Sequence, residues 1–66
     1  MNMDWISVKD RLPTQNGKYL SWNGKDIQFE YFSDGYFLMS MFLVIRYHND
    51  RIPFTHWMPL PKPPKE

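Results

Sequence analysis

The chain has 66 residues, of which 42% are hydrophobic and 18% aromatic, and it carries a formal net charge of +1. This size allows one compact domain, and so apolar a composition excludes a disordered chain. Because acids and bases are mixed along the sequence, no single-sign field is expected to attract duplex nucleic acid. We predict one domain over residues 1–61, followed by an extended proline-rich tail over residues 62–66.

The sequence also bears on the compartment. It has no cysteine, which fits a reducing environment and leaves no disulfide to support the fold. The segment Met1–Asp4 has no basic patch before an apolar run, so a secretory signal is not expected. The longest apolar run, Tyr36–Ile45, is about half of the roughly 20 residues that cross a bilayer. We therefore expect a cytoplasmic protein without a membrane partner.

The first expected element is a short helical turn that begins near Ser7. A serine there can accept hydrogen bonds from backbone N–H groups, and Asp10 follows three residues later, in the first turn. Pro13 disfavours the helical conformation at Leu12, so the turn should end by Arg11.

Three turn signals follow, at Asn16-Gly17, Asn23-Gly24 and Asp34-Gly35. The stretches between them, Lys18–Trp22 and Asp26–Ser33, are rich in aromatic and branched residues that favour strands. The pattern predicts an antiparallel β-meander.

A two-residue turn at Asn23-Gly24 would place Trp22 opposite Lys25 and Leu20 opposite Ile27. The side chains then separate onto two faces. The apolar face holds Leu20, Trp22, Ile27, Phe29 and Tyr31, and the mainly polar face holds Tyr19, Ser21, Asp26, Gln28 and Glu30. This separation of apolar from polar side chains supports the proposed register.

A second two-residue turn, at Asp34-Gly35, pairs Phe32 with Phe37 and adds four large apolar side chains to the otherwise polar face. They are Phe32, Phe37, Met39 and Met41. Two interpretations are open. The chain ends, with Trp5 and Trp57 as structural anchors, fold across this patch, or the patch stays exposed and binds another protein or a second copy of the chain.

The run that contains this patch also allows a helix over Phe37–Arg46. A strand is favoured because Val44, Ile45 and the preceding Asp-Gly turn suit a hairpin. A straight strand over Tyr36–Tyr47 would be too long for the domain, so it should bend, bulge or end near Val44. With a last short strand at Phe54–Met58, the expected fold is α+β and mostly β: a three- to four-stranded antiparallel meander with a short N-terminal helical turn.

Candidate chemistry is sparse. His48 and His56 are the only histidines, cysteine is absent and the acids are scattered, so neither a metal site nor a cofactor is predicted. No nucleophile with a base, paired carboxylates or phosphate-binding glycine loop is recognisable. We therefore expect a protein that is not an enzyme.

Both ends of the chain carry specific motifs. They are Trp5-Ile6-Ser7-Val8 with Asp10-Arg11-Leu12-Pro13, and Thr55-His56-Trp57-Met58-Pro59-Leu60-Pro61 followed by Pro63-Pro64. Together they resemble the phage and prophage family of small domains of unknown function that is numbered five hundred and fifty-one in its series. The resemblance implies a bacterial or phage cytoplasm and a mobile-element setting, where small accessory proteins commonly bind host components. It implies no activity, cofactor or catalytic residue.

On this basis we expect a phage or prophage accessory protein that modulates or inhibits a host protein, such as a defence component. The expected contact surface is the patch of Phe32, Phe37, Met39 and Met41, through which the chain could also form a homodimer. The alternative is a module that binds single-stranded nucleic acid on exposed tyrosines such as Tyr19, Tyr31 or Tyr36. The near-neutral charge disfavours that alternative.

Overall fold

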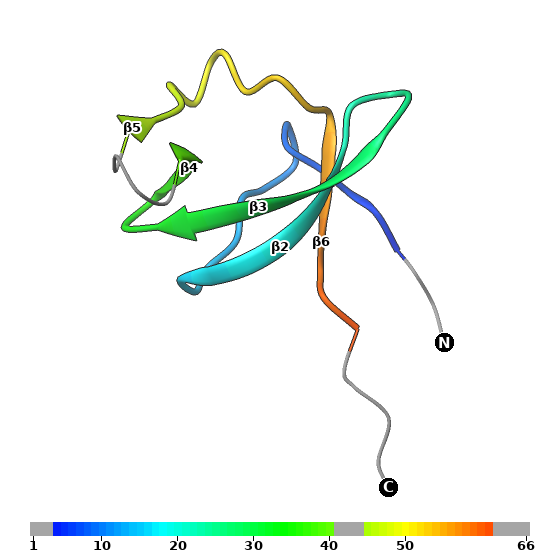
Figure 1. The fold of residues 1–66 in the computed structure, drawn as a ribbon, viewed down its shortest axis with the longest axis horizontal. Coiled ribbons are helices and arrows are strands. Elements are labelled where there is room, and N and C mark those ends of the chain that lie inside the picture. The colour runs from blue at the N-terminus through cyan, green and yellow to red at the C-terminus, as the bar shows by residue number, and fades with distance from the viewer. Residues whose placement is uncertain (1–3, 41–44, 62–66) are drawn as a thin grey trace, which may run out of the picture.

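A computed structural model describes residues 4–40 and 45–61 of the chain. These residues form one antiparallel sheet of six strands in the order β1-β6-β2-β3-β4-β5 (Figure 1). The strands are β1 (Ile6–Ser7), β2 (Gly17–Trp22), β3 (Ile27–Ser33), β4 (Tyr36–Ser40), β5 (Ile45–Arg46) and β6 (His56–Pro59).

The predicted α+β class is wrong, because the described residues contain six strands and no helix. Ser7 does accept from the Lys9 backbone N–H, over 3.1 Å, and its carbonyl oxygen accepts from the Asp10 N–H over 3.0 Å. These bonds close a single turn. The turn does not develop into a helix. The Val8 N–H donates to the Thr55 carbonyl oxygen, which keeps this part of the chain paired with the segment before β6. No described helix is long and apolar enough to cross a membrane.

The predicted meander is present as β2, β3 and β4, and the two ends of the chain extend it. Strand β6 lies between β1 and β2, with Trp57 opposite Ile6 on one side and opposite Ser21 on the other. The C-terminal motif therefore inserts between two earlier strands, and the sheet has more strands than the three or four expected.

The register of the first hairpin differs from the prediction by two residues. Trp22 lies opposite Ile27, and Leu20 lies opposite Phe29. The cause is the side chain of Asn23, whose Oδ1 accepts from the N–H groups of Lys25 and Asp26 over 2.9 and 2.8 Å. This side-chain turn lengthens the loop to four residues. A shift of two residues leaves every side chain on its predicted face.

The second hairpin has the predicted register, with Phe32 opposite Phe37. Asp34 and Gly35 have φ angles of 53° and 94°, as a tight hairpin turn requires. The run that follows forms β4 and β5 with a bulge between Leu38 and Ser40, so its described part is strand and not helix. Residues 41–44 lie outside the described residues.

Aromatic side chains from four strands and one loop form the core. Trp57, Tyr19, Phe32, Phe37 and Phe54 make a continuous series of edge-to-face contacts, with ring centroids 4.9 to 6.5 Å apart. Edge-to-face pairs at such distances add to the stabilisation that burial alone provides.

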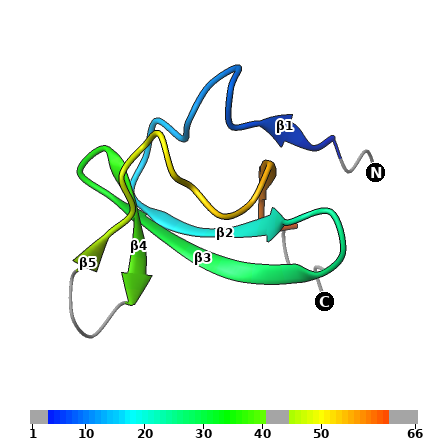
Figure 2. The same cartoon turned by 90° about the horizontal axis from the view of Figure 1, so that it is seen from above.

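Two loops decide which face of the sheet is buried. Residues 8–16 and 47–55 lie on the same side of β2 and β3 (Figure 2). Their apolar side chains Val8, Leu12, Tyr47 and Ile52 pack against the aromatic core. We call the covered side, which carries Tyr19, Ser21, Glu30, Phe32 and Phe37, the inner face, and the opposite side the outer face.

Candidate interaction surface

The structure distributes the four predicted contact residues over different environments. Phe32 is 5% exposed and Phe37 is 0% exposed, and both lie in the core. Met39 is exposed, and Met41 lies outside the described residues. The two phenylalanines are covered by the loops and by Phe54, so this set does not form a continuous accessible surface.

The two predicted anchors also differ. Trp57 is buried in the core, and its Nε1 donates a hydrogen bond of 2.9 Å to the carbonyl oxygen of Arg11. Trp5 is half-buried and does not belong to the core cluster. Of the two, Trp57 is the one that joins the core to the N-terminal loop.

Strand alternation and pairing place described side chains from all six strands on the outer face. They are Ser7 of β1; Lys18, Leu20 and Trp22 of β2; Ile27, Phe29, Tyr31 and Ser33 of β3; Tyr36 and Leu38 of β4; Arg46 of β5; and His56 and Met58 of β6. Trp22, Ile27 and Phe29 are 37%, 58% and 60% exposed. Because the loops cover the other side, the apolar face is accessible around these three residues, although Met58 on the same face is only 5% exposed.

One row of paired residues crosses the outer face with a cation at each end. Lys18 lies opposite Tyr31, Tyr31 opposite Leu38, and Leu38 opposite Arg46. With strands about 4.8 Å apart, the two basic residues are separated by roughly 14 Å along the row. The exposed Trp22, Ile27 and Phe29 lie on one side of this row, toward the Asn23 loop.

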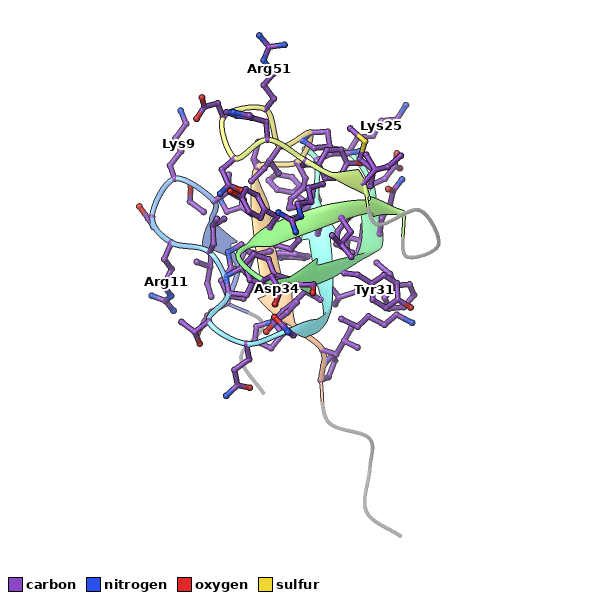
Figure 3. The ribbon with its side chains drawn as sticks, turned by 90° about the vertical axis from the view of Figure 1, so that its left-hand side faces the viewer. Lys9, Arg11, Lys25, Tyr31, Asp34 and Arg51 are labelled. Carbon is purple, nitrogen blue, oxygen red and sulfur yellow. The ribbon has the colours of Figure 1, made fainter. Side chains whose placement is uncertain are left out.

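Aromatic rings hold both cations over the sheet. Lys18 Nζ lies 4.3 Å from the centroid of the Phe29 ring and 5.7 Å from that of Tyr31. The Arg46 guanidinium lies 5.0 Å from the Tyr36 ring. Each contact is worth about 0.5–1 kcal/mol at an exposed site. Figure 3 shows Tyr31 on the side of the sheet away from the loop that carries Lys9 and Arg11.

No carboxylate accompanies these cations on the described part of the face, since none of the outer-face residues named above is acidic. Asp26 lies next to β3, in the hairpin loop, and Glu30 points to the inner face. The described part of the outer face is therefore apolar and positively charged.

Glu30 is the acidic group of the inner face. The Ser21 hydroxyl donates to its Oε2 over 2.9 Å. Burial raises the pKa of the Glu30 carboxyl above its ordinary value of 4.5, and the Ser21 hydrogen bond opposes this only in part. Burial, followed by the negative charge of Glu30, raises the pKa of the Tyr47 phenol as well. Both groups lie on the loop-covered side and leave the charge of the outer face unaltered.

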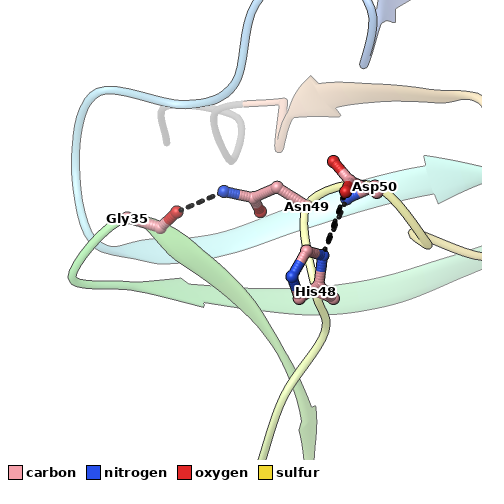
Figure 4. A network of polar contacts seen from close by, with 4 residues as sticks. All are labelled: Gly35, His48, Asn49 and Asp50. Atoms are coloured by element: carbon pink, nitrogen blue, oxygen red, sulfur yellow. Dashed lines mark hydrogen bonds and ion pairs between the residues drawn. The ribbon is translucent and has the colours of Figure 1, made fainter.

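The two histidines lie in separate polar environments. His48 Nδ1 lies 3.4 Å from the Asp50 backbone nitrogen and 3.5 Å from its Oδ2, and Asn49 Nδ2 donates to the Gly35 carbonyl oxygen (Figure 4). This network is exposed. Among residues 4–40 and 45–61, no group of three or more potential ligand side chains could hold a metal ion.

An open pocket of about 660 Å³ lies beside His56, between the turn after β1 and the loop before β6. It is lined by Ser7, Val8, Lys9, Asn49, Asp50, Ile52, Phe54, Thr55 and His56. The Thr55 hydroxyl oxygen lies 3.3 Å from the Trp22 carbonyl oxygen and 2.8 Å from His56 Nδ1.

Comparison with known proteins supports the resemblance read from the two ends of the chain. The model of a family described as a protein of unknown function, DUF551, matches residues 4–65. The chain belongs to the DUF551 family. No curated protein and no solved structure was found to match it.

The two motifs that identified this DUF551 chain are neighbours in the fold. The N-terminal motif supplies β1 and the turn after it, and the C-terminal motif supplies β6. They meet through the pairs Ile6–Trp57 and Ser7–His56, and again through the Trp57–Arg11 hydrogen bond. The motifs therefore build the scaffold at one side of the sheet.

Proposed function

We propose that this DUF551 protein is a non-enzymatic accessory protein of the bacterial cytoplasm, of phage or prophage type. It binds a host protein, such as a defence component, and modulates or inhibits it. The contact surface is the outer face. The patch predicted from the sequence is not used, because Phe32 and Phe37 are buried. The proposal depends on one observation: Trp22, Ile27 and Phe29 are exposed together on the side of the sheet that the loops do not cover.

The size and composition of this surface support protein binding. Large side chains carry about 150–250 Å² each, so these three expose roughly 300 Å² of apolar surface. Apolar patches of that size on small soluble proteins are often functional. Trp, Tyr and Arg, which dominate the binding energy of many interfaces, are all present on the outer face as Trp22, Tyr31 and Arg46.

Single-stranded nucleic acid is the second candidate, and one arrangement favours it. Phe29 and Tyr31 are two residues apart on β3, and Lys18 Nζ on the neighbouring strand lies near both rings. Sheets that bind single strands likewise combine aromatic rings for base stacking with basic residues. The Lys18 ammonium, however, covers the Phe29 ring on which a base would stack. Ile27, Leu20 and Leu38 add aliphatic surface, which suits a protein better than a base.

Photocrosslinking from the outer face tests the proposal. Phe29 is replaced by p-benzoylphenylalanine, which is a larger phenylalanine, and the protein is irradiated in nuclease-treated bacterial lysate. The matched probe replaces Thr14, which is exposed in the loop on the inner side. We expect a discrete host-protein adduct from position 29 and none from position 14.

A pair of aspartate variants serves as the control for surface specificity. Ile27→Asp puts a charge on the outer face, whereas Gln28→Asp puts the same charge at the next position, which is also exposed. The adduct should disappear with Ile27→Asp and persist with Gln28→Asp, with both variants folded by circular dichroism. An adduct insensitive to Ile27→Asp would refute this contact surface. A nucleic acid adduct in untreated lysate would favour the second candidate, and an adduct with a second copy would favour a homodimer.

A further inference from the structure

The charge of the outer face constrains its partner. Lys18 and Arg46 stand at the two ends of one cross-strand row, and no outer-face residue among those described is acidic. We propose that the partner is a protein that presents acidic side chains beside an apolar surface. This inference rests on the proposed function and specifies the partner's chemistry.

The two cations are positioned before any partner arrives. Their side chains lie over aromatic rings at 4.3 and 5.0 Å, so part of the entropy of ordering a long side chain is already lost in the free protein. The ammonium and guanidinium groups have no carboxylate beside them among the described residues of the outer face. A surface of this kind gains most from an opposing pair of carboxylates, with apolar contacts beside them.

The same charge disfavours a second copy of the chain. A face-to-face dimer would bring together two surfaces that each carry Lys18 and Arg46 and, among the residues the structure describes, no outer-face acid, which is an unfavourable juxtaposition. An acidic protein avoids this repulsion, because its charge is complementary to that of the outer face.

Defined polypeptides allow a direct test without the natural partner. The protein labelled with nitrogen-15 is titrated with a random copolymer of glutamate and tyrosine, which is acidic and apolar, and separately with a copolymer of lysine and tyrosine. We expect the first to shift amide signals of β2, β3 and β4 on the outer face and the second to leave them unchanged. Raising the salt to about 300 mM should remove most of the shift, because exposed charges are then screened.

Charge-removing variants sharpen the test. The double substitution Lys18→Met and Arg46→Met keeps apolar stems near the Phe29 and Tyr36 rings while removing both charges. This double variant should bind the acidic copolymer with an affinity at least about tenfold lower. The matched double substitution Lys9→Met and Arg51→Met removes the same net charge from exposed positions off the outer face and should change affinity less than about twofold. Unchanged thermal unfolding confirms that each variant is folded.

The outcomes separate this inference from the proposed function. If neither copolymer shifts the outer face, or if both double variants weaken binding equally, the acidic-partner inference is overturned, while the adduct from position 29 can still establish protein binding. If oligothymidylate of equal charge binds the outer face more tightly than the glutamate–tyrosine copolymer, the ligand is nucleic acid and both proposals are wrong. If no host-protein adduct forms, the proposed function is wrong regardless of copolymer binding.

Discussion

The inner and outer faces of the sheet carry similar amounts of aromatic surface and have opposite fates. Phe32 and Phe29 lie three residues apart on the same strand, yet Phe32 is 5% exposed and Phe29 is 60% exposed. Their chemistry is identical, so the difference comes from what covers each face. The loops of residues 8–16 and 47–55 bring Leu12 and Phe54 over the inner face.

This comparison shows that a small single-layer sheet can bury one apolar face and leave the other for binding. The two described loops cover only the inner face, and Trp22, Ile27 and Phe29 stay accessible on the other. Substitutions on the two faces should therefore separate stability from binding.

The largest expected contrast is between Phe37→Ala and Phe29→Ala. Phe37 is fully buried between the Phe32 and Phe54 rings, so its loss should cost about 3–5 kcal/mol. A domain of this length has only about 3–10 kcal/mol of stability in all, so the Phe37→Ala variant should be largely unfolded. Phe29→Ala should cost less than about 1 kcal/mol, because it loses one exposed cation–π contact and little burial.

Chemical denaturation of the two variants, followed by circular dichroism, checks this prediction. Equal losses of stability would mean that both faces are covered in solution, and the comparison between them would fail.

Trp57→Phe is expected to have an intermediate effect on the inner face. The smaller ring keeps most of the edge-to-face contact with Tyr19 but loses the indole N–H that donates to the Arg11 carbonyl oxygen. The loss of a buried hydrogen bond together with some volume should cost about 1–3 kcal/mol. Hydrogen exchange should show that protection falls most in the N-terminal turn that contains Arg11. A uniform loss across the sheet would contradict the role of this bond in holding that turn.

Much of the sheet was predictable because its signals are local. The Asp34-Gly35 turn set the pairing of Phe32 with Phe37, and the alternation along β2 and β3 assigned side chains to the correct faces. The Asn23 loop was longer than predicted because its side chain accepts two backbone N–H groups, a possibility that the Asn-Gly pair does not reveal. The prediction of a helical turn at Ser7 was wrong, because a serine side chain that accepts from a nearby backbone N–H also stabilises an isolated turn.

The candidate surface was harder to predict because it depends on long-range packing. The sequence identified Leu20, Trp22, Ile27 and Phe29 as sharing a face but gave no information on which face the loops would cover. The alternation of side chains along a strand shows which residues share a face, but it does not show which of the two faces is buried. One signal was present in the sequence. The segments around Leu12 and Ile52 carry apolar residues that do not follow a strand pattern, and such residues are expected to pack against a face of the sheet. The aromatic residues they could reach were Phe32 and Phe37.

The smallest expected effect, that of Glu30→Gln, tests the polar edge of the inner face. Because the pKa of Glu30 is raised in the fold, the native state holds its proton at pH values where the unfolded chain has lost it. Stability is thus highest below the ordinary value of 4.5 and falls as the pH rises through the folded pKa. A glutamine at this position does not ionise, so the variant lacks this loss of stability with rising pH. Its side chain can still accept from the Ser21 hydroxyl, and the variant should therefore be more stable than the wild type at neutral pH.

The gain should be less than about 1 kcal/mol, because solvent reaches part of the Glu30 side chain. Thermal unfolding of wild type and Glu30→Gln between about pH 4 and pH 8 measures it, and the two curves should converge at the acid end. Removing the negative charge should also lower the pKa of the Tyr47 phenol, which can be followed by NMR. Parallel pH profiles for the two proteins would mean that Glu30 is solvated like an outer-face side chain, and the distinction between the faces would then be confined to their aromatic residues.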